Sequence, residues 1–549
     1  MKKSVFIFTV VMMLTMLTSC TDNDDNAAIE PTEIVELAEA TILWYGAGGG
    51  NTDAGIMADF HQFYSAKPES FDRVNIVAQY KVSQKPADYQ GKTDEEMAQK
   101  AEELAAGKTE EDMEAMEYSD YFTLCHPKQG ATYRFAIDHK KTLRQQLLEA
   151  EPYGEMNADV TCPDSLTHFI NWAARTYPAK KYILVLADHG GGYLPNHDVA
   201  EAATTRGLIF DDGYQNGNTK GNNHKCFSGK SFAHALKNAD VRMEGIVPYL
   251  CLMNNMEFLY EVKDLTDYVA CSTYTMWGTI GAMQSLPDNL ATGQDTKTAL
   301  ANFVDANVYS WDKYLFDPGN PEEPNYYDMT LTETKRLDDL VPVLKEFTDR
   351  LVDTYLNGTA DQCAVIDECT ANAVKVVNQY PLYDMAKYME SLFMELPEVF
   401  DEGLFNRLAT SFNACILHQR NAKYLTNHNY QVDYSVILAV RGNYVCYVYD
   451  ATDTNLQSAT VYYTNGTTET YQYVPGSDDS SSGSLDHYEF QESGTWPSTF
   501  ADTYQHTTFD RLVGWSRWLL INESAPPAWS PSSFYFQLPE DDMSGIPNL

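Results

Sequence analysis

Residues 184–193 read LVLADHGGGY, and residues 245–253 read GIVPYLCLM. Each stretch opens with an apolar run of the length and composition of a buried strand, and a chemically reactive side chain follows the run. In an open α/β sheet, reactive groups lie just past the carboxyl ends of the strands. The two stretches therefore predict that His189 and Cys251 lie at one edge of a common sheet.

The surrounding sequence alternates between strand and helix patterns. Further strands are expected at residues 41–45, 74–80, 133–137 and 268–272, and helices at residues 165–177, 230–238 and 253–262. Such alternation is typical of helices packed on both faces of a mostly parallel sheet. The predicted fold class is therefore α/β, a three-layer sandwich with a mainly parallel central sheet, followed by a helical segment and a β-rich C-terminal region.

A thiol and an imidazole at adjacent strand ends form a nucleophile–base pair. Cys251 leads into the predicted helix at 253–262, and a helix N-terminus favours the thiolate. His189 would take the thiol proton and return it to a leaving amine. The glycines at 190–192 permit tight turns, and their N–H groups could face a developing oxyanion. Asp188 is not included, because neighbours near a strand point in opposite directions.

The two stretches together resemble the clostripain family of cysteine peptidases. Residues 188–193 resemble its His-Gly motif, and residues 251–257 (CLMNNME) resemble the segment that begins at its nucleophile. The resemblance also includes residues 43–45, 166–173 and 177–179 and covers roughly residues 40–290. It implies a caspase-like fold, Cys251 as nucleophile, His189 as base and the Gly190 N–H in the oxyanion hole. It also implies self-cleavage between His189 and Cys251 in many members and a calcium requirement in some.

The sequence departs from the family pattern beside the nucleophile. The family usually has Asp-Ala before the Cys, where the Asp binds a basic P1 side chain, but this chain has Tyr249 and Leu250. We therefore expect a P1 preference that is not strictly basic. Tyr249, which offers an apolar face and a hydroxyl but no charge, is expected to contribute to a pocket for an uncharged or aromatic P1 residue. Thr273, Tyr274 and Trp277 resemble the segment that lines the substrate pocket in relatives, and ordinary packing at the rim is the alternative.

The N-terminus resembles a bacterial lipoprotein signal. Lys2 and Lys3 precede an apolar run at 5–17, and Cys20 ends a lipobox-like LTSC. The run is shorter than a membrane span and has the length of a signal-peptide core. The acidic residues 21–25 resemble a surface-export signal. We expect an exported outer-membrane lipoprotein, anchored by lipid on Cys20 and exposed at the surface; a periplasmic location and a plain cleaved signal are the alternatives.

The chain divides by composition into five parts. They are a signal peptide at 1–19, an acidic tether at 20–39, a peptidase domain at 40–316, a helical region at 317–430 and a β-rich region at 431–549. The 549 residues carry a formal net charge of −40, which repels nucleic-acid phosphates. The expected partners are therefore a peptide or protein substrate and the membrane, with no nucleic acid.

Two other functions are open at the level of sequence. A metal hydrolase would use Asp188, His189, His197 and Asp198, which lack a regular ligand spacing, and no metal site is predicted. A catalytically inactive surface lipoprotein would bind protein or glycan, with Tyr249 and Leu250 as marks of a decayed site. Calcium is expected only by family resemblance, and two adjacent carboxylates at Asp211 and Asp212 do not make a site.

Overall fold

The computed structural model describes residues 37–47, 53–82, 92–108, 121, 124, 130–155, 158–193, 207–211, 225–276, 281–314, 327–376, 382–421, 435–441, 443–449, 456–463, 467–474, 487–495 and 504–521. The predicted signal peptide and tether, with Cys20, lie outside the described residues apart from 37–39. Within the described part, no helix is long and apolar enough to cross a membrane.

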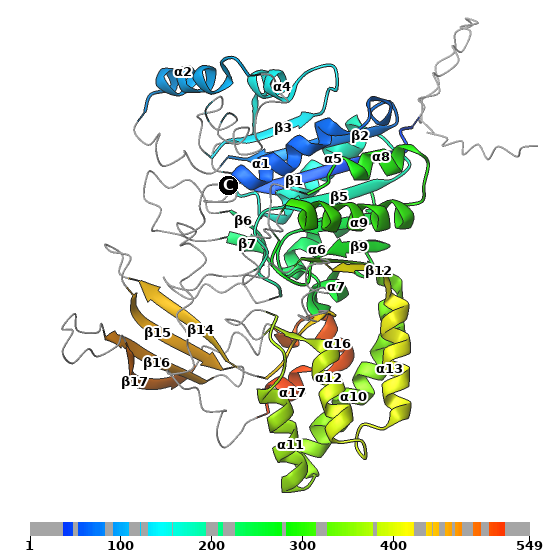
Figure 1. Cartoon of the computed structure of the whole chain (residues 1–549), viewed down its shortest axis with the longest axis vertical. Helices are drawn as coiled ribbons and strands as arrows, with labels where there is room; N and C mark the ends of the chain where they lie inside the picture. The colour runs from blue at the N-terminus through cyan, green and yellow to red at the C-terminus, as the bar shows by residue number, and fades with distance from the viewer. Residues whose placement is uncertain are drawn as a thin grey trace, which may run out of the picture. The chain divides into compact units, whose positions relative to one another are not determined.

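A nine-stranded sheet forms the centre of the chain, in the order β12-β10-β9-β8-β5-β1-β2-β3-β4. Its strands run across the upper half of Figure 1, from blue β1 to yellow β12. Their bounds are β1 Ala40–Ala47, β2 Val74–Lys81, β3 Thr132–Ala136, β4 Pro152–Tyr153, β5 Tyr182–Ala187, β8 Gly245–Tyr249, β9 Tyr268–Cys271, β10 Asp328–Glu333 and β12 Ile416–Asn421.

The five strands β2, β1, β5, β8 and β9 are parallel to one another, whereas β3, β4, β10 and β12 pair antiparallel at the two sides. Alternate residues of a strand face opposite sides of the sheet. On β5, Leu184 and Leu186 belong to one buried cluster, and Ile183 and Val185 belong to another. Both faces of the sheet are therefore covered, as the continuous apolar run predicts.

Helices cover both faces of the sheet. One face packs on α5 (Pro163–Thr176), α6 (Gly229–Lys237) and α7 (Met256–Val262), through residues such as Phe169 and Phe232. The other packs on α1 (Asp53–His61), α8 (Ser285–Ala291) and α9 (Thr296–Tyr314). The predicted three-layer α/β sandwich with a mainly parallel sheet is confirmed.

The sheet continues past the boundary expected at residue 317. The region at 317–430 is predicted to be helical, but it also contains three strands: β10, β11 (Leu382–Asp384) and β12, which pairs with β10. Helices make up most of the other described residues of this region. The helices there are α10 (Leu337–Asn357), α11 (Ala360–Ala371), α12 (Met385–Glu395) and α13 (Glu402–Cys415).

Residues beyond 431 form strands and two short helices. Strand β13 (Ile437–Ala439) pairs with β11 (Leu382–Asp384). The strands β14 (Asn443–Tyr449), β15 (Leu456–Tyr463), β16 (Thr467–Val474) and β17 (His487–Thr495) form an antiparallel sheet. Helices α16 (Thr508–Val513) and α17 (Ser516–Leu519) bring the buried Trp515 and Trp518 into the same cluster as Leu184.

The remaining elements are short or lie at the margins. They are 3-10 turns at Gln62–Ser65, Pro68–Ser70 and Thr334–Arg336, helices α2 (Asp94–Ala105) and α4 (Leu143–Glu149), and the hairpin of β6 (Leu208–Asp211) with β7 (Lys225–Phe227). Among them, β6 bears on the candidate site, because it runs beside the chain that carries His189.

Candidate active site

His189 and Cys251 occupy equivalent positions on neighbouring strands. In the parallel pair β5–β8, Ala187 lies opposite Tyr249, so each candidate residue follows its strand's last paired residue by two positions. Both side chains are partly exposed. The chain after His189 runs directly against the nucleophile segment, because a Cβ atom at Gly190 would lie 2.2 Å from the carbonyl oxygen of Cys251.

The backbone of Met276 contacts the Cys251 thiol. The Met276 N–H lies 3.1 Å from the sulfur, and the Met276 carbonyl oxygen lies 3.6 Å from it. An N–H group that donates to sulfur favours the thiolate. The sequence contains no signal for this contact, since Met276 is 25 residues from Cys251.

The helix after Cys251 begins later than predicted. It starts at Met256 rather than 253, because Asn255 caps it by accepting a hydrogen bond from the Phe258 N–H. Leu252 takes a left-handed conformation with φ of 63°, which a helix cannot contain. The thiol therefore does not lie at the helix N-terminus, and the expected help from the helix dipole is replaced by the Met276 N–H.

Strand β6 supports the His189 backbone. Its Ile209 N–H donates to the His189 carbonyl oxygen at 3.2 Å, and Leu208 forms a bridge with Gly190. The Phe210 ring lies edge-on to the imidazole at 6.2 Å between centroids. Asp188 accepts a hydrogen bond from the Phe210 N–H at 2.5 Å. This carboxylate therefore binds the backbone of β6, which agrees with leaving Asp188 out of the predicted nucleophile–base pair.

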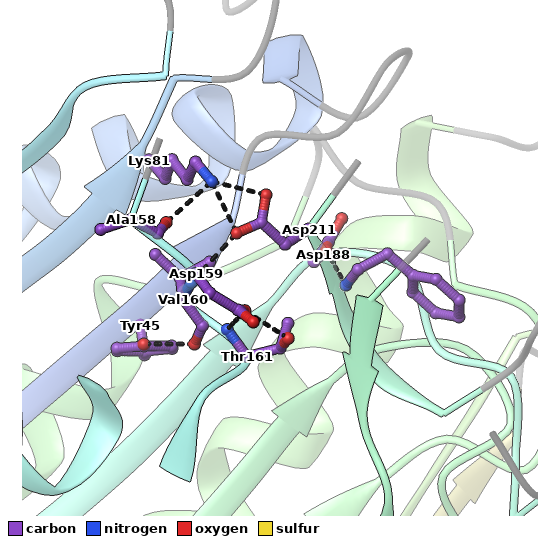
Figure 2. A network of polar contacts seen from close by, with 9 residues as sticks. Tyr45, Lys81, Ala158, Asp159, Val160, Thr161, Asp188 and Asp211 are labelled. Atoms are coloured by element: carbon purple, nitrogen blue, oxygen red, sulfur yellow. Dashed lines mark hydrogen bonds and ion pairs between the residues drawn. The ribbon is translucent and has the colours of Figure 1, made fainter. Parts of the chain in front are cut away.

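A buried ion pair anchors the end of β6. The Lys81 ammonium lies 2.6 Å from both oxygens of Asp211, and both side chains are almost fully buried. Asp211 also accepts the Val160 N–H, while Lys81 donates to the Ala158 carbonyl. Figure 2 shows Lys81 between this carbonyl and the Asp211 carboxylate. Because Asp211 is already paired with a cation, it does not fit a calcium ligand.

The Tyr249 side chain is packed into the core. It is 4% exposed, its ring lies 6.1 Å from that of Trp311, and its hydroxyl lies 3.5 Å from the Asn307 amide oxygen. Burial raises the pKa of this phenol well above its ordinary value, and the nearby Asp59 carboxylate adds to that shift. Leu250 belongs to the buried cluster on the other face of the sheet. Neither of the two residues before Cys251 carries a carboxylate.

The other residues expected to line the substrate pocket differ in how far they are buried. Thr273 is fully buried, and its hydroxyl lies 3.3 Å from the Ser435 carbonyl oxygen. Tyr274 is half-buried, and Trp277 lies outside the described residues. Sequence reasoning missed Val376, Leu382 and Ile437, which form a buried cluster with Leu252. Cys251, Tyr193 and Tyr274 pack against that cluster.

The alternative metal site finds no support among the residues that the structure describes. No group of three or more His, Cys, Asp or Glu side chains there is arranged to hold a metal. His197 and Asp198 lie outside the described residues.

The sequence model of the clostripain family (Peptidase_C11) matches residues 127–478, which include both His189 and Cys251. The chain belongs to the clostripain family. Clostripain from Hathewaya histolytica is 24% identical over 174 residues, which are 30% of this chain and 32% of that protein. The chain thus matches about a third of this curated relative's length.

Solved structures of clostripain-family (C11) proteins are similar to the chain. One is iotapain, a secreted cysteine protease from Bacteroides thetaiotaomicron, with 16% identity, a TM-score of 0.47, and coverage of 70% of this chain and 87% of iotapain. Another, a secreted protease from the same organism bound to an irreversible peptide inhibitor, has 12% identity, a TM-score of 0.49, and coverage of 87% and 99%. Family membership and the observed strand order together agree with the predicted caspase-like fold.

Proposed function

We propose that this clostripain-family protein is an exported, lipid-anchored cysteine endopeptidase that hydrolyses peptide bonds through Cys251 and His189. The observation that carries the proposal is the alignment of the two residues, each two positions past a paired strand residue, with Gly190 against the Cys251 backbone. This arrangement suits a thiol and an imidazole that act on one substrate carbonyl.

In the proposed reaction, the Cys251 thiolate attacks the carbonyl carbon and the carbonyl oxygen becomes an oxyanion. The Gly190 N–H donates to that oxyanion. The C–N bond then breaks, the leaving amine takes the proton held by His189, and a thioester remains on Cys251. Water, deprotonated by His189, hydrolyses the thioester and restores the thiol.

The proposed P1 preference is not strictly basic. Support comes from position 249, where the residue is an uncharged tyrosine whose side chain is packed in the core, so that it supplies no carboxylate for a basic P1 side chain. The test is a peptide library varied at P1, with the mature chain and its Cys251→Ala variant. Cleavage of uncharged or aromatic P1 residues that vanishes in the variant is expected. A strict preference for Lys or Arg would overturn the specificity proposal and direct attention to the buried carboxylate of Asp59, to be tested with Asp59→Asn.

The same experiment separates the enzyme from an inactive binding protein. Absence of Cys251-dependent cleavage, with and without calcium, would exclude the peptidase under those conditions. Tyr274 and Trp277 are proposed as further substrate contacts. The lipid anchor at Cys20 is tested separately, by incorporation of labelled fatty acid into the full-length chain. Incorporation is expected to be lost in Cys20→Ser, and retention in that variant would contradict the anchor.

A further inference from the structure

Residues 272–276 run alongside residues 251–254 and hold them through backbone hydrogen bonds. The Leu252 N–H donates to the Tyr274 carbonyl at 3.1 Å, and the Asn254 N–H donates to the Ser272 carbonyl at 2.9 Å. The Met276 N–H lies 3.1 Å from the Cys251 sulfur. The position of the 272–276 segment therefore decides which backbone groups face the thiol.

One carboxylate, that of Asp328, accepts hydrogen bonds from the first three residues of this segment. Asp328 accepts the Thr273 N–H at 3.0 Å and the Tyr274 N–H at 3.0 Å, and its Oδ1 lies 3.0 Å from the Ser272 hydroxyl oxygen. Asp328 is the first residue of β10, which runs antiparallel to β9 with Thr330 opposite Cys271. Its side chain reaches forward to the segment that leaves β9.

The carboxylate is placed where a charge is costly. Asp328 is 4% exposed, and burial raises the pKa of its carboxyl, against the effect of the three donors. Among the residues that the structure describes, no Lys or Arg pairs with it. A buried carboxylate without a counter-ion is tolerated when several hydrogen bonds compensate its desolvation. These donors all belong to the segment beside the nucleophile.

The Asn254 side chain also joins the two segments. The Asn254 amide group donates to the Thr273 hydroxyl oxygen at 2.9 Å and to the Ser435 carbonyl at 3.0 Å. Ser435 is itself held by Asp384, which accepts both its N–H and its hydroxyl. The segment that follows β9 is therefore fixed at Ser272, Thr273 and Tyr274, and Met276 follows two residues later.

We propose that Asp328 is a positioning residue for the candidate nucleophile. By fixing the Thr273 and Tyr274 amides, it holds the Met276 N–H at the Cys251 sulfur and so favours the thiolate. This inference rests on the proposed role of Cys251. It assigns to Asp328 no contact with substrate.

The test compares Asp328→Asn with Asp510→Asn in the mature chain. Asp510 is a matched control, since it is also buried and accepts an N–H and a hydroxyl, both from Ser516, in the helices α16 and α17. The measurement is the rate of iodoacetamide alkylation at Cys251 as a function of pH, by mass spectrometry of the Cys251 peptide. Circular dichroism reports the folded fraction.

In Asp328→Asn, the amide group turns an N–H toward the Thr273 or Tyr274 N–H, so the segment shifts and the hydrogen bond to sulfur weakens. The alkylation midpoint is expected to rise by about half a pH unit or more. Peptide cleavage near neutral pH is expected to fall about tenfold and to recover partly at higher pH. Asp510→Asn is expected to leave the midpoint unchanged, because both donors to the Asp510 carboxylate belong to Ser516 and neither belongs to the 272–276 segment.

If Asp328→Asn fails to fold, Ser272→Ala serves as the second variant. It removes the hydrogen bonds of the Ser272 hydroxyl with Asp328 and with the Tyr274 backbone, while the Tyr274 N–H keeps Asp328 as its acceptor. It is expected to raise the midpoint by a smaller amount. An unchanged midpoint in the folded variants would overturn the proposal for Asp328 while the peptidase stands. A raised midpoint in a chain whose wild type cleaves no peptide would support the positioning role and reject the peptidase.

Discussion

Gly190 and Cys251 are in direct backbone contact: a Cβ atom at position 190 would lie 2.2 Å from the Cys251 carbonyl oxygen and 2.9 Å from its nitrogen. Neither neighbour is the end of a flexible side chain, so any larger residue must displace the backbone. The glycine after the candidate base is therefore required by packing, whichever part its N–H plays in the chemistry.

Gly190→Ala is expected to reduce kcat/KM by about a hundredfold or more, since it moves the candidate base and an oxyanion donor away from the thiol. Overpacking is also expected to destabilise the chain by about 1–3 kcal/mol. The control is Gly229→Ala, where a Cβ atom meets only the side chain of Glu261, at 3.2 Å. Steady-state kinetics and urea unfolding measure both effects; wild-type kinetics in Gly190→Ala would contradict the prediction.

Lys81→Met is expected to destabilise the protein by about 3–5 kcal/mol, because it leaves the buried Asp211 carboxylate without its cation. Lys180→Met is the matched control, since the Lys180 partner Glu39 lies in an exposed ion pair. Its cost is expected to stay below about 1 kcal/mol. Urea unfolding measures the free energy of unfolding of both variants. Equal decreases would show that the buried pair stabilises the protein no more than the exposed pair does.

Glu257 is expected to make stability depend on pH. Burial raises the pKa of its carboxyl to about 7 from an ordinary 4.5, although the Tyr504 hydroxyl and the Ala439 N–H donate to it. Because the folded-state pKa is the higher one, the contribution is complete below pH 4.5 and is lost as the pH rises through 7.

Glu257→Gln removes this titration. The stability of the wild type relative to the variant is expected to fall by about 3 kcal/mol between pH 4.5 and pH 8. Urea unfolding of both proteins across that range gives the difference directly, and effects of the other ionisable groups cancel in it. A difference that does not change with pH would reject the assignment of this carboxyl as the titrating group.

Trp515→Ala is expected to cost about 3–5 kcal/mol, because the ring is fully buried and its N–H donates to the Ala439 carbonyl at 2.5 Å. Leu512→Ala, in α16 and 38% exposed, is expected to cost far less. Thermal unfolding compares them. Similar, small losses would mean that the C-terminal helices are a dispensable addition to the core.

Prediction from sequence succeeded where the pattern is local. The runs at 41–45, 74–80 and 182–187 are apolar at every position or nearly so, and such runs form strands when both faces of a sheet are covered. It failed at β10 and β12, which lie in or beside helical patterns. These strands form because each finds a partner at the side of the sheet, and a partner is not visible in the local sequence.

The candidate pair follows the same division. The sequence by itself predicted the strand-end positions of His189 and Cys251, the glycines after His189 and the lack of an acid before Cys251. Strand ends and residue types are local properties of the sequence. The Met276 N–H at the sulfur, the Asp328 carboxylate behind it and the burial of Tyr249 are decided only by the folded chain. Each depends on segments 25 to 58 residues apart, which meet because the chain folds around one sheet.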